Sequence, residues 1–548
     1  MIDRRTVIGI AVVAGLALVA GSWPGPSANA AEAANKGPEP SKSAREAQAL
    51  ARKIDRLVAE KWAEARVEPA GPADDSEYLR RVSLDLVGKI PTAAEAREFL
   101  DDTSLDKRAR LVERLLAGPS YTARATELWR QLLLPEADTD TQARLAAPAF
   151  EAWLRKKVVE DAGYDKMVRE LLTAKLGARS TAANPANGAR AEPSPAGFFI
   201  AKEGKPENLA AGTARVFLGV RLECAQCHNH PFAKWKREEF WGLAAFFAGV
   251  SKQGPDDGFG AVREVANRRE LAIPGTDKVV KAAFLDGAPL AWKAKVEARE
   301  VLADWVTSPK NPFFAKAAVN RVWARFFGSG LVDPVDDMGG DSVSTHPELL
   351  DMLAAEFVAH DYELKYLIRA IAATRAYGLT SALDRPEPTP PVLFSAMPVR
   401  GLSAGQLFSS LAQATGLREA PANMYAGDDV GARGRFLELF ANRDEKPTEV
   451  QTSILQALTL MNGGLVSGAT SLAAGDTLAA IAEAPYLDTA GRVEELYLAA
   501  LTRKPRAEES SLLVEYVEKA GPAPEARSAA LADVFWALLN GPEFKHNH

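Results

Sequence analysis

The sequence predicts a mainly α-helical protein, with two helical domains joined by a small β-containing insert. Apolar residues recur at three- and four-residue spacing through most of the chain after residue 46, as they do in amphipathic helices. Ala, Leu, Arg and Glu, which are good helix formers, are abundant in the same segments. The short strand-like runs at 269–274 and 278–285 flank Gly275 and lie within residues 251–298. We therefore place this insert between the two helical domains.

Residues 1–30 are typical of an export signal. Arg4 and Arg5 precede an apolar run at 7–20, and residues 28–30 read Ala-Asn-Ala, a cleavage site for signal peptidase. The apolar run is short and rich in Gly and Ala, so we expect no stable membrane span after cleavage. The arginine pair fits either a general or a twin-arginine signal. The protein is expected in the periplasm or at the cell surface.

The first helical domain is expected at residues 46–250, after a flexible tether at 31–45 that is small, polar and Pro-containing. Thr92 and Glu95 have the spacing of a capping box that opens a helix. Further helices are expected at 111–116, 121–134 and 150–172, with a Gly/Pro/Ser/Asn-rich loop at 176–196 and another helix that starts at Pro206. A last helix, 240–247, is rich in aromatic residues, and we favour core packing for these over a cofactor wall.

The second helical domain is expected in two parts, 299–382 and 401–548, joined by a Pro-rich linker at 383–400. Its helices are expected at 297–305, 311–328, 345–360, 364–377, 403–415, 452–461, 477–483, 493–501, 508–519 and 526–539.

Three local features of this domain are also predicted. Thr345 and Glu348 form a second capping-box pattern. The loop 333–344 holds several Asp residues but lacks the spacing of a calcium-binding EF-hand, so we expect a solvated loop. His546 and His548 fall in what is expected to be a frayed terminus.

The candidate site is the run Cys224-Ala-Gln-Cys227-His228, which holds the only two cysteines of the chain. This spacing is the one used for covalent attachment of a c-type haem. Two thiols at positions i and i+3 can form thioethers to the two vinyl groups of one porphyrin, and the following imidazole can be the proximal iron ligand. For the sixth iron position His346 is our first candidate, ahead of His360, Met338 and Met352.

The same residues allow three other interpretations. Zinc could bind Cys224 and Cys227 with one or both of His228 and His230, although ligands so close in sequence would strain a tetrahedral site. The two cysteines could form a disulfide or a redox-active dithiol. They could also be two buried free thiols, which an oxidising compartment disfavours. The cofactor is therefore haem c, or alternatively zinc or none.

Composition excludes some functions. Lys and Arg number 66 against 72 Asp and Glu, a net charge of −6, and the sequence has no basic block, which argues against a general nucleic-acid binder. The hydrolase and nucleotide motifs G-x-S-x-G, H-E-x-x-H and the P-loop are missing from the sequence, and this leaves open whether the protein is an enzyme.

Several long stretches resemble a known family. Residues 217–247 read FLGVRLECAQCHNHPFAKWKREEFWGLAAFF and resemble the core of the planctomycete cytochrome-C-like domain, an exported domain of unknown function. Residues 78–102 (YLRRVSLDLVGKIPTAAEAREFLDD) resemble its beginning. The second half is similar to the companion domain that usually follows it, in the stretches REVLADWVTSPKNPFFAKAAVNRVWARFFGSGLVDPVDD, THPELLDMLAAEFVAHDYELKYLIRAIAATRAYGLTS, ILQALTLMNGGLV and FWALLNGPEF.

The resemblance implies a C-x-x-C-H site with a haem, and no established activity. It covers most of residues 45–545, and since the chain lacks the extra cytochrome domain of many members, one haem site is the most we expect. Two functional hypotheses follow. The first is an exported haem c protein that transfers electrons to or from a partner protein. The second is a non-redox structural or binding protein whose Cys/His cluster holds zinc or a disulfide.

Overall fold

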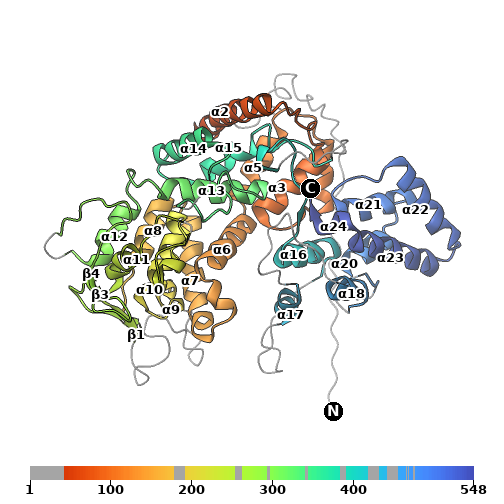
Figure 1. Ribbon diagram of the computed structural model, residues 1–548. Coiled ribbons are helices and arrows are strands. Elements are labelled where there is room, and N and C mark those ends of the chain that lie inside the picture. Colours follow the sequence, from red (N-terminus) through yellow and green to blue (C-terminus); the bar gives the residue numbers. More distant parts are fainter. Residues whose placement is uncertain are drawn as a thin grey trace, which may run out of the picture. The chain divides into compact units, whose positions relative to one another are not determined.

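The computed structural model describes residues 42–177, 192–231, 233–252, 262–292, 296–339, 343–382, 391–417, 431–440, 454–463, 466, 468, 470–472 and 475–548. The expected signal peptide, most of the tether, most of the loop at 176–196 and residues 383–390 of the Pro-rich linker lie outside these residues. The chain divides into two compact units, 1–45 and 46–548. The described residues are mainly helical, as predicted (Figure 1).

The first half of the described chain consists of helices. They are α2 (Lys42–Ala65), α3 (Asp75–Val87), α4 (Ala93–Asp101), α5 (Lys107–Ala117), α6 (Pro119–Leu133), η1 (Pro135–Asp138), α7 (Thr141–Val159), α8 (Tyr164–Leu172), α9 (Gly197–Ala201), α10 (Pro206–Thr213), η3 (Ala214–Leu218), η4 (Glu223–Gln226), α11 (Arg237–Ala244) and η5 (Ala245–Phe247). The predicted capping box of Thr92 and Glu95 is present at the start of α4.

Two of the differences from the predicted helices have a clear local cause. Helix α2 begins at Lys42, four residues inside the expected tether, because these residues include neither Gly nor Pro and extend the following helix backwards. The single helix expected at 150–172 is two helices, α7 and α8. The chain turns between them at Asp161, which has a φ of 52°, and at Gly163, where an added Cβ would lie 2.5 Å from the carbonyl oxygen of Asp361.

The expected β insert is present as two small antiparallel hairpins. Strand β1 (Val250–Lys252) pairs with β2 (Val262–Glu264), and β3 (Glu270–Ala272) pairs with β4 (Val279–Lys281). Between β3 and β4 the chain reverses at Gly275, whose φ of 74° favours glycine. The carbonyl of Gly242 in α11 accepts a hydrogen bond from the backbone of Ala283, which ties the second hairpin to the segment that follows the cysteines.

The second half is also helical. It contains α12 (Ala298–Val306), α13 (Phe314–Phe327), α14 (Pro347–Ala359), α15 (Leu364–Ala372), η7 (Pro391–Leu393), α16 (Ala404–Thr415), α17 (Gly431–Leu439), α18 (Ile454–Asn462), α20 (Asp476–Glu483), α21 (Thr489–Leu501), α22 (Ala507–Lys519), α23 (Pro524–Asn540) and α24 (Pro542–Lys545), with strands β5 (Arg400–Gly401) and β6 (His546–Asn547). Gly328 ends α13 in the left-handed conformation, as the sequence indicates.

The second predicted capping box is wrong. Helix α14 begins one residue later than the box requires, because Pro347 occupies its first position and His346 is the N-cap without a side-chain cap bond. The Thr345 hydroxyl instead donates to the carbonyl of Leu331 at 3.3 Å, and the Thr345 backbone N–H donates to the same carbonyl. A contact with a distant loop therefore replaces the local cap.

Helix α3 joins the two parts of the fold. Every residue from Tyr78 to Leu86 is buried, including Arg80, Arg81 and Asp85. One face of α3 belongs to a large apolar core built from residues 47–397, and Leu84 belongs to a second core formed mainly by residues 402–544. Figure 1 shows α3 between α5 and the C-terminal helix α24. The helix therefore contributes to both cores at once.

The C-terminus is paired rather than frayed. Strand β6 pairs with β5, and the side chain of Asn547 is buried and donates to Asp85 at 2.9 Å. The guanidinium of Arg80 donates to the carbonyl of Phe544 at 2.8 Å, and that of Arg81 donates to the carbonyl of His548 at 3.1 Å. The prediction of a frayed end failed because these partners lie more than 400 residues away in sequence.

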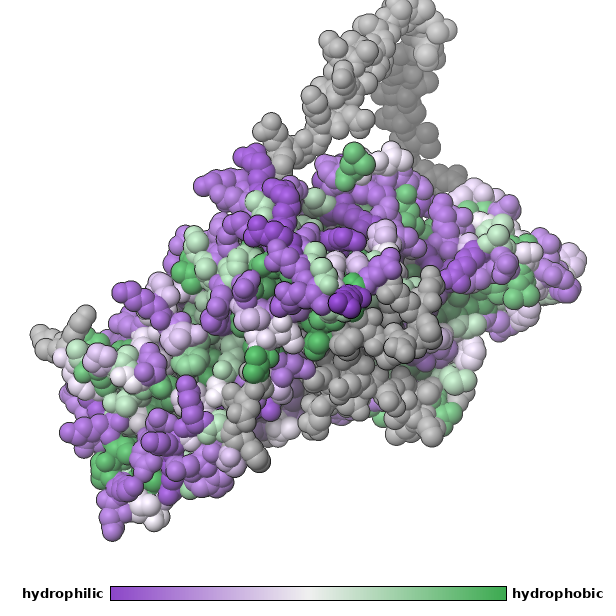
Figure 2. Space-filling model, turned by 45° about the horizontal axis from the view of Figure 1, so that its top comes forward, coloured by the Kyte–Doolittle hydropathy of each residue, from purple (hydrophilic) through white to green (hydrophobic). Residues whose placement is uncertain are grey.

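The surface in Figure 2 intersperses hydrophilic and hydrophobic residues. Among the helices that the structure describes, none is both long enough and apolar enough to cross a bilayer.

Candidate functional site

The cysteine motif lies on a short 3-10 turn. The π-helical turn η3 ends at Gly219, in the left-handed conformation with a φ of 64°, and the chain then enters η4. Cys224 and Cys227 are both exposed and carry free thiols, whereas Ala225 between them is buried. Residues three apart on a 3-10 turn eclipse one another, so the two thiols lie on the same, solvent-facing side.

Helix α11 holds the turn in place through hydrogen bonds. The carbonyl oxygen of Gln226 accepts hydrogen bonds from the indole N–H of Trp241 at 3.1 Å and from Nε of Arg237 at 3.2 Å. The backbone N–H of Arg237 donates to the side-chain oxygen of Asn229 at 3.0 Å. Because Gln226 within the motif and Asn229 just after it are both tied to this helix, the cysteines sit on a defined frame although they face water.

The two histidines of the motif have different roles. Nδ1 of His228 lies 2.7 Å from the carbonyl oxygen of Asn229, and since a carbonyl can only accept, Nδ1 carries the proton. The Nε2 lone pair of the neutral, exposed His228 ring therefore remains for a metal. Nδ1 of His230 instead accepts from the backbone N–H of Ala233 at 2.9 Å, which in a neutral ring puts the proton on Nε2.

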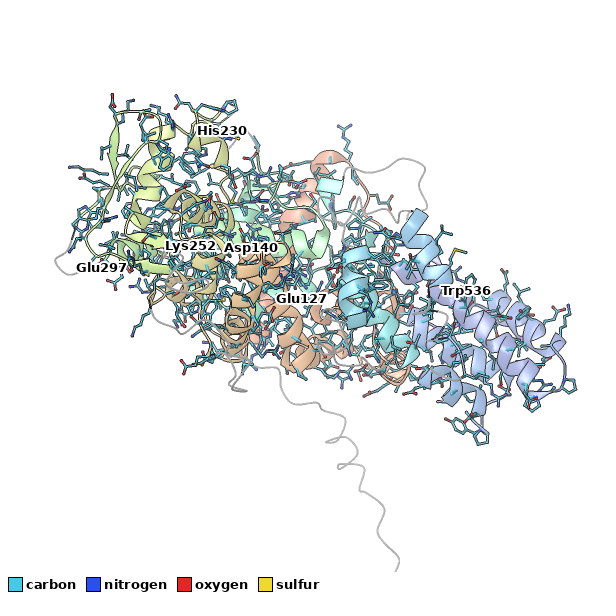
Figure 3. All side chains as sticks on the ribbon, turned by 90° about the horizontal axis from the view of Figure 1, so that it is seen from below. Glu127, Asp140, His230, Lys252, Glu297 and Trp536 are labelled. Carbon is cyan, nitrogen blue, oxygen red and sulfur yellow. The ribbon has the colours of Figure 1, made fainter. Side chains whose placement is uncertain are left out.

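His230 thus organises its own loop. Its backbone N–H donates to the carbonyl of Trp235 at 2.8 Å, closing the loop that follows the cysteines. Figure 3 shows His230 at the periphery of the ribbon, on this loop. Within the described part of the chain no group of three or more His, Cys, Asp or Glu side chains is arranged to hold a metal ion.

The aromatic residues after the motif belong to the core, as favoured from the sequence. Phe240, Trp241, Phe246 and Phe247 are all buried. Phe246 stacks on Phe284 of the β insert with ring centroids 5.1 Å apart. These side chains support the turn from inside and do not form an exposed wall beside the thiols.

A loop from the second half of the chain packs against the site, which sequence reasoning missed. Asp336 is buried and accepts from Nε of Arg215 at 2.6 Å and from Nε of Arg221 at 2.7 Å. The neighbouring Arg side chains lower the pKa of the Asp336 carboxyl against the effect of burial. The expectation of a solvated loop at 333–344 is therefore wrong for Asp336, because two arginines next to the motif pair with it. In the sequence, this contact is indicated only by the opposite charges of Asp336 and of Arg215 and Arg221.

The same loop brings Met338 to the site. The backbone N–H of Met338 donates to the carbonyl of Gly219 at 2.7 Å, and its thioether lies over Gly219, where an added Cβ would be 3.3 Å from the sulfur. The next residue, Gly339, packs against the buried ring of Trp235, and an added Cβ there would lie 2.7 Å from the ring. Of the four candidates for the sixth iron position, Met338 is the one in contact with this segment among the described residues.

His346, the first candidate, lies in a different environment. It is buried, its Nδ1 is 2.9 Å from the Thr345 hydroxyl, and its ring packs against Phe394 with centroids 5.3 Å apart. Burial, and next the positive charge of Lys61, lowers the pKa of His346 to about 4. Its Nε2 has no hydrogen-bond partner among the described residues.

The other two candidates are held in the second half of the chain. His360 stacks on Tyr366 with ring centroids 3.7 Å apart, and its Nδ1 donates to the carbonyl of Glu356. Met352 packs against the large apolar core. Neither contact involves the cysteine turn.

Comparisons with known proteins identify two regions. Residues 53–252 match a family model described as PSCyt2, protein of unknown function (DUF1549), and residues 298–517 match one described as PSD1, protein of unknown function (DUF1553). No curated protein and no solved structure matches the chain. The two regions follow in the order expected from the sequence, and the β hairpins lie mainly between them.

Proposed function

We propose that this chain, with its PSCyt2 and PSD1 regions in tandem, is an exported protein that holds one haem c and transfers single electrons to or from a partner protein. Cys224 and Cys227 would attach the group, and His228 would be the proximal iron ligand. The observation that carries the proposal is the exposed turn, which presents two free thiols on one side and an imidazole with an available Nε2 lone pair next to them.

The residues of the turn fit this attachment. Each thiol adds across one vinyl group, so that a sulfur–carbon bond forms at one vinyl carbon and the thiol hydrogen goes to the other, without an external oxidant. The reaction requires that both sulfurs are reduced and accessible, as Cys224 and Cys227 are. When bound, the haem would supply a one-electron redox couple.

His228 is oriented for its role by its neighbour. The hydrogen bond from Nδ1 to the carbonyl of Asn229 fixes the tautomer and the ring orientation, and such a bond is the usual second contact of a metal-binding histidine. The bonds from Arg237 and Trp241 to Gln226 hold the turn itself, so that little rearrangement of the backbone is needed when the ligand binds.

The zinc alternative is less well supported by the geometry. A tetrahedral site would need His230 or another side chain as the fourth ligand, and His230 already uses Nδ1 to bind the backbone of Ala233. The disulfide alternative would require oxidation of the two exposed thiols, whereas haem attachment uses them in the reduced form. Haem attachment would use the two exposed thiols and the His228 ring as they lie on the turn.

The test is a visible spectrum of the denatured chain. The full-length protein is produced in a host that matures c-type cytochromes, and a reduced-minus-oxidised spectrum is recorded after unfolding. We expect a haem band that stays with the polypeptide and that disappears in the double variant Cys224→Ala/Cys227→Ala. His230→Ala is the matched control, which should retain the covalent band.

Two results would contradict the proposal. A wild-type chain without a haem band, but with one zinc ion per chain by native mass spectrometry, would make the site a structural zinc centre. A chain without haem whose mass shows an oxidised thiol pair would make it a disulfide. In either case the protein would be a structural or binding protein, as in the second hypothesis.

A further inference from the structure

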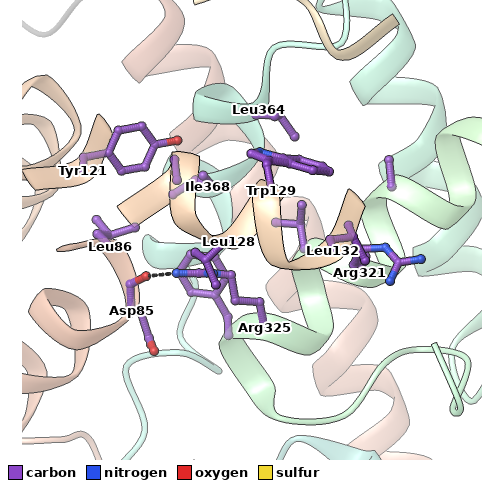
Figure 4. Close-up of a pocket in the computed structure, with 14 residues that line it drawn as sticks. Asp85, Leu86, Tyr121, Leu128, Trp129, Leu132, Arg321, Arg325, Leu364 and Ile368 are labelled. Atoms are coloured by element: carbon purple, nitrogen blue, oxygen red, sulfur yellow. Dashed lines mark hydrogen bonds between the residues drawn. The ribbon is translucent and has the colours of Figure 1, made fainter. Parts of the chain in front are cut away.

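A second candidate site lies between four helices, away from the cysteine turn, and is partly open to solvent. It is a cavity of about 300 Å³ between helices α3, α6, α13 and α15, here called the junction pocket (Figure 4). Helices α3 and α6 belong to the PSCyt2 region, whereas α13 and α15 belong to the PSD1 region. Ligand pockets occur preferentially at such junctions, and this volume is at the lower end of their usual range.

Most of the pocket wall is apolar. Helix α6 contributes Ala125, Leu128, Trp129 and Leu132, and α15 contributes Leu364 and Ile368. The Trp129 ring stacks on Tyr164 with centroids 5.3 Å apart, which fixes it as one wall. A surface of this kind gains free energy by burying a hydrocarbon chain or ring.

The wall also carries an arginine without a carboxylate partner. Arg325 of α13 donates to the backbone carbonyl of Asp85 at 2.6 Å, as Figure 4 shows. Among the described residues it forms no ion pair, because the Asp85 carboxylate already accepts from Arg400 at 3.0 Å and from the Tyr377 hydroxyl at 2.7 Å. Burial, and next the charge of Arg124, lowers the pKa of Arg325 to about 9.

The charge of Asp85 partly offsets the effect of burial on Arg325, but no neighbouring carboxylate forms an ion pair with it among the described residues. Arg124 pairs with Glu127 at 2.8 Å, so that carboxylate is also occupied. Arg321, one helical turn before Arg325, donates to the backbone carbonyls of Arg215 and Val216, and its Nε is buried without a partner. Arg321 lies beside Leu132, on the other side of the pocket from Asp85 (Figure 4).

Tyr121 supplies a neutral donor to the same wall. Burial raises the pKa of Tyr121 to about 12, so its hydroxyl stays protonated at neutral pH. Its hydroxyl points toward Ile368 and Trp129 in Figure 4. A ligand in the pocket thus meets two kinds of donor, a guanidinium and a phenol, and an otherwise apolar surface.

We propose that the junction pocket binds a small amphiphilic carboxylate. The carboxylate would accept from Arg325, with the Tyr121 hydroxyl as a further donor, and the hydrocarbon part would lie along Leu128, Trp129 and the α15 side chains. A carboxylate at this position would pair with a half-buried guanidinium that forms no ion pair among the described residues, and charge-assisted hydrogen bonds of this type are strong. The proposal is independent of the cysteine site.

The test compares ligands that share one tail. Octanoate, octanol and octyltrimethylammonium are titrated into the full-length protein by isothermal titration calorimetry. We expect octanoate to bind at least about tenfold more tightly than octanol, because only the carboxylate pairs with Arg325. The cationic amphiphile should bind least.

Two variants locate the binding. Arg325→Gln keeps a donor for the Asp85 carbonyl but removes the charge, and it should reduce octanoate affinity to that of octanol. Arg56→Gln, which replaces an exposed arginine on α2, is the matched control. It should change the affinity for neither octanoate nor octanol. Ala125→Trp fills the pocket and should abolish binding of both ligands, which tests the site even when Arg325→Gln fails to fold.

The proposal is overturned when octanoate and octanol bind with equal affinity, when the cationic amphiphile is preferred, or when no ligand shows saturable binding. It is also overturned when Ala125→Trp folds and still binds octanoate as the wild type does.

Discussion

Asp85 of α3 and Arg400 of β5 form an ion pair of 3.0 Å in which the side chains are only 3% and 7% exposed. The same carboxylate accepts hydrogen bonds from the Tyr377 hydroxyl at 2.7 Å and from the amide of Asn547 at 2.9 Å. Four segments that are far apart in sequence therefore converge on one buried carboxyl group, which links the first helical region to the end of the chain.

The first prediction concerns this carboxylate. Asp85→Asn leaves Arg400 with a buried charge and no counter-charge, and breaking a buried pair in this way costs roughly 3–5 kcal/mol. We expect the free energy of unfolding, measured with urea, to fall by about that amount. Glu60→Gln removes an exposed ion pair with Arg56 and should change it by less than about 1 kcal/mol. Equal effects of the two substitutions would show that Asp85 does not stabilise the junction.

The second prediction concerns the glycine before the cysteine turn. Gly219→Ala places a Cβ at a φ of 64°, and this atom would lie 3.1 Å from Cβ of Ala317 and 3.3 Å from the Met338 sulfur. Gly275→Ala has a similar φ of 74° with no atom within 4 Å, so it measures the conformational cost alone. Each substitution should lower the free energy of unfolding by about 1 kcal/mol, because alanine disfavours the left-handed backbone. Gly219→Ala should lower it by about 1 kcal/mol more, because its Cβ crowds the neighbouring atoms.

Thermal unfolding of the two glycine variants, followed by circular dichroism, provides the comparison. A Gly219→Ala variant no less stable than Gly275→Ala would mean that the loop carrying Met338 does not pack against the turn.

The third prediction concerns pH. The pKa of His346 is lowered to about 4 in the folded protein, below the ordinary value of 6.5 that it regains on unfolding. Between these values the unfolded chain binds more protons than the folded one, so stability falls as the pH is lowered from 6.5 towards 4. The two charged groups that act on His346 are Lys61, which lowers its pKa, and Glu64, which raises it.

The wild type should therefore lose about 3 kcal/mol more than His346→Gln when the pH is lowered from 7 to 4. Urea unfolding at several pH values measures this difference. His228→Gln changes an exposed ring and should follow the wild-type curve. If the free energy of unfolding changes with pH in the same way for the wild type and His346→Gln, the buried imidazole takes up a proton without unfolding.

The fourth prediction concerns the thiols. In the reduced, cofactor-free chain both cysteines are exposed, so Ellman's reagent should release two equivalents of chromophore without denaturant. Cys227→Ala should release one. A wild-type chain whose thiols react only after unfolding would contradict the exposed turn, and with it the accessibility on which haem attachment depends.

The sequence determined the elements whose rules are local. The capping box of Thr92 and Glu95 and the hairpin around Gly275 depend on residues a few positions apart, and both are in the structure as expected. The helical content follows from spacing that recurs every three or four residues. The cysteine motif was also visible, because its spacing is itself the signal.

Tertiary contacts decided what local rules could not. Thr345 has the spacing of a capping residue, but Leu331 and Pro347 determine where its hydroxyl binds and where the helix begins. Asp336 is in a polar loop, and two arginines more than 100 residues earlier draw it into the interior. In each case the free energy of satisfying a buried polar group exceeds a local preference of about 1 kcal/mol.

Helix α3 shows the same limit most clearly. Residues 75–87 carry no helix prediction, and nothing in their spacing reveals that Arg80, Arg81 and Asp85 are all buried. Those charges are compatible with the interior because backbone carbonyls from the end of the chain and side chains from β5 and β6 satisfy them. The sequence alone therefore specified the helices with local capping signals and the cysteine motif, while only the tertiary structure decided which charges are buried, because burial depends on partners hundreds of residues apart.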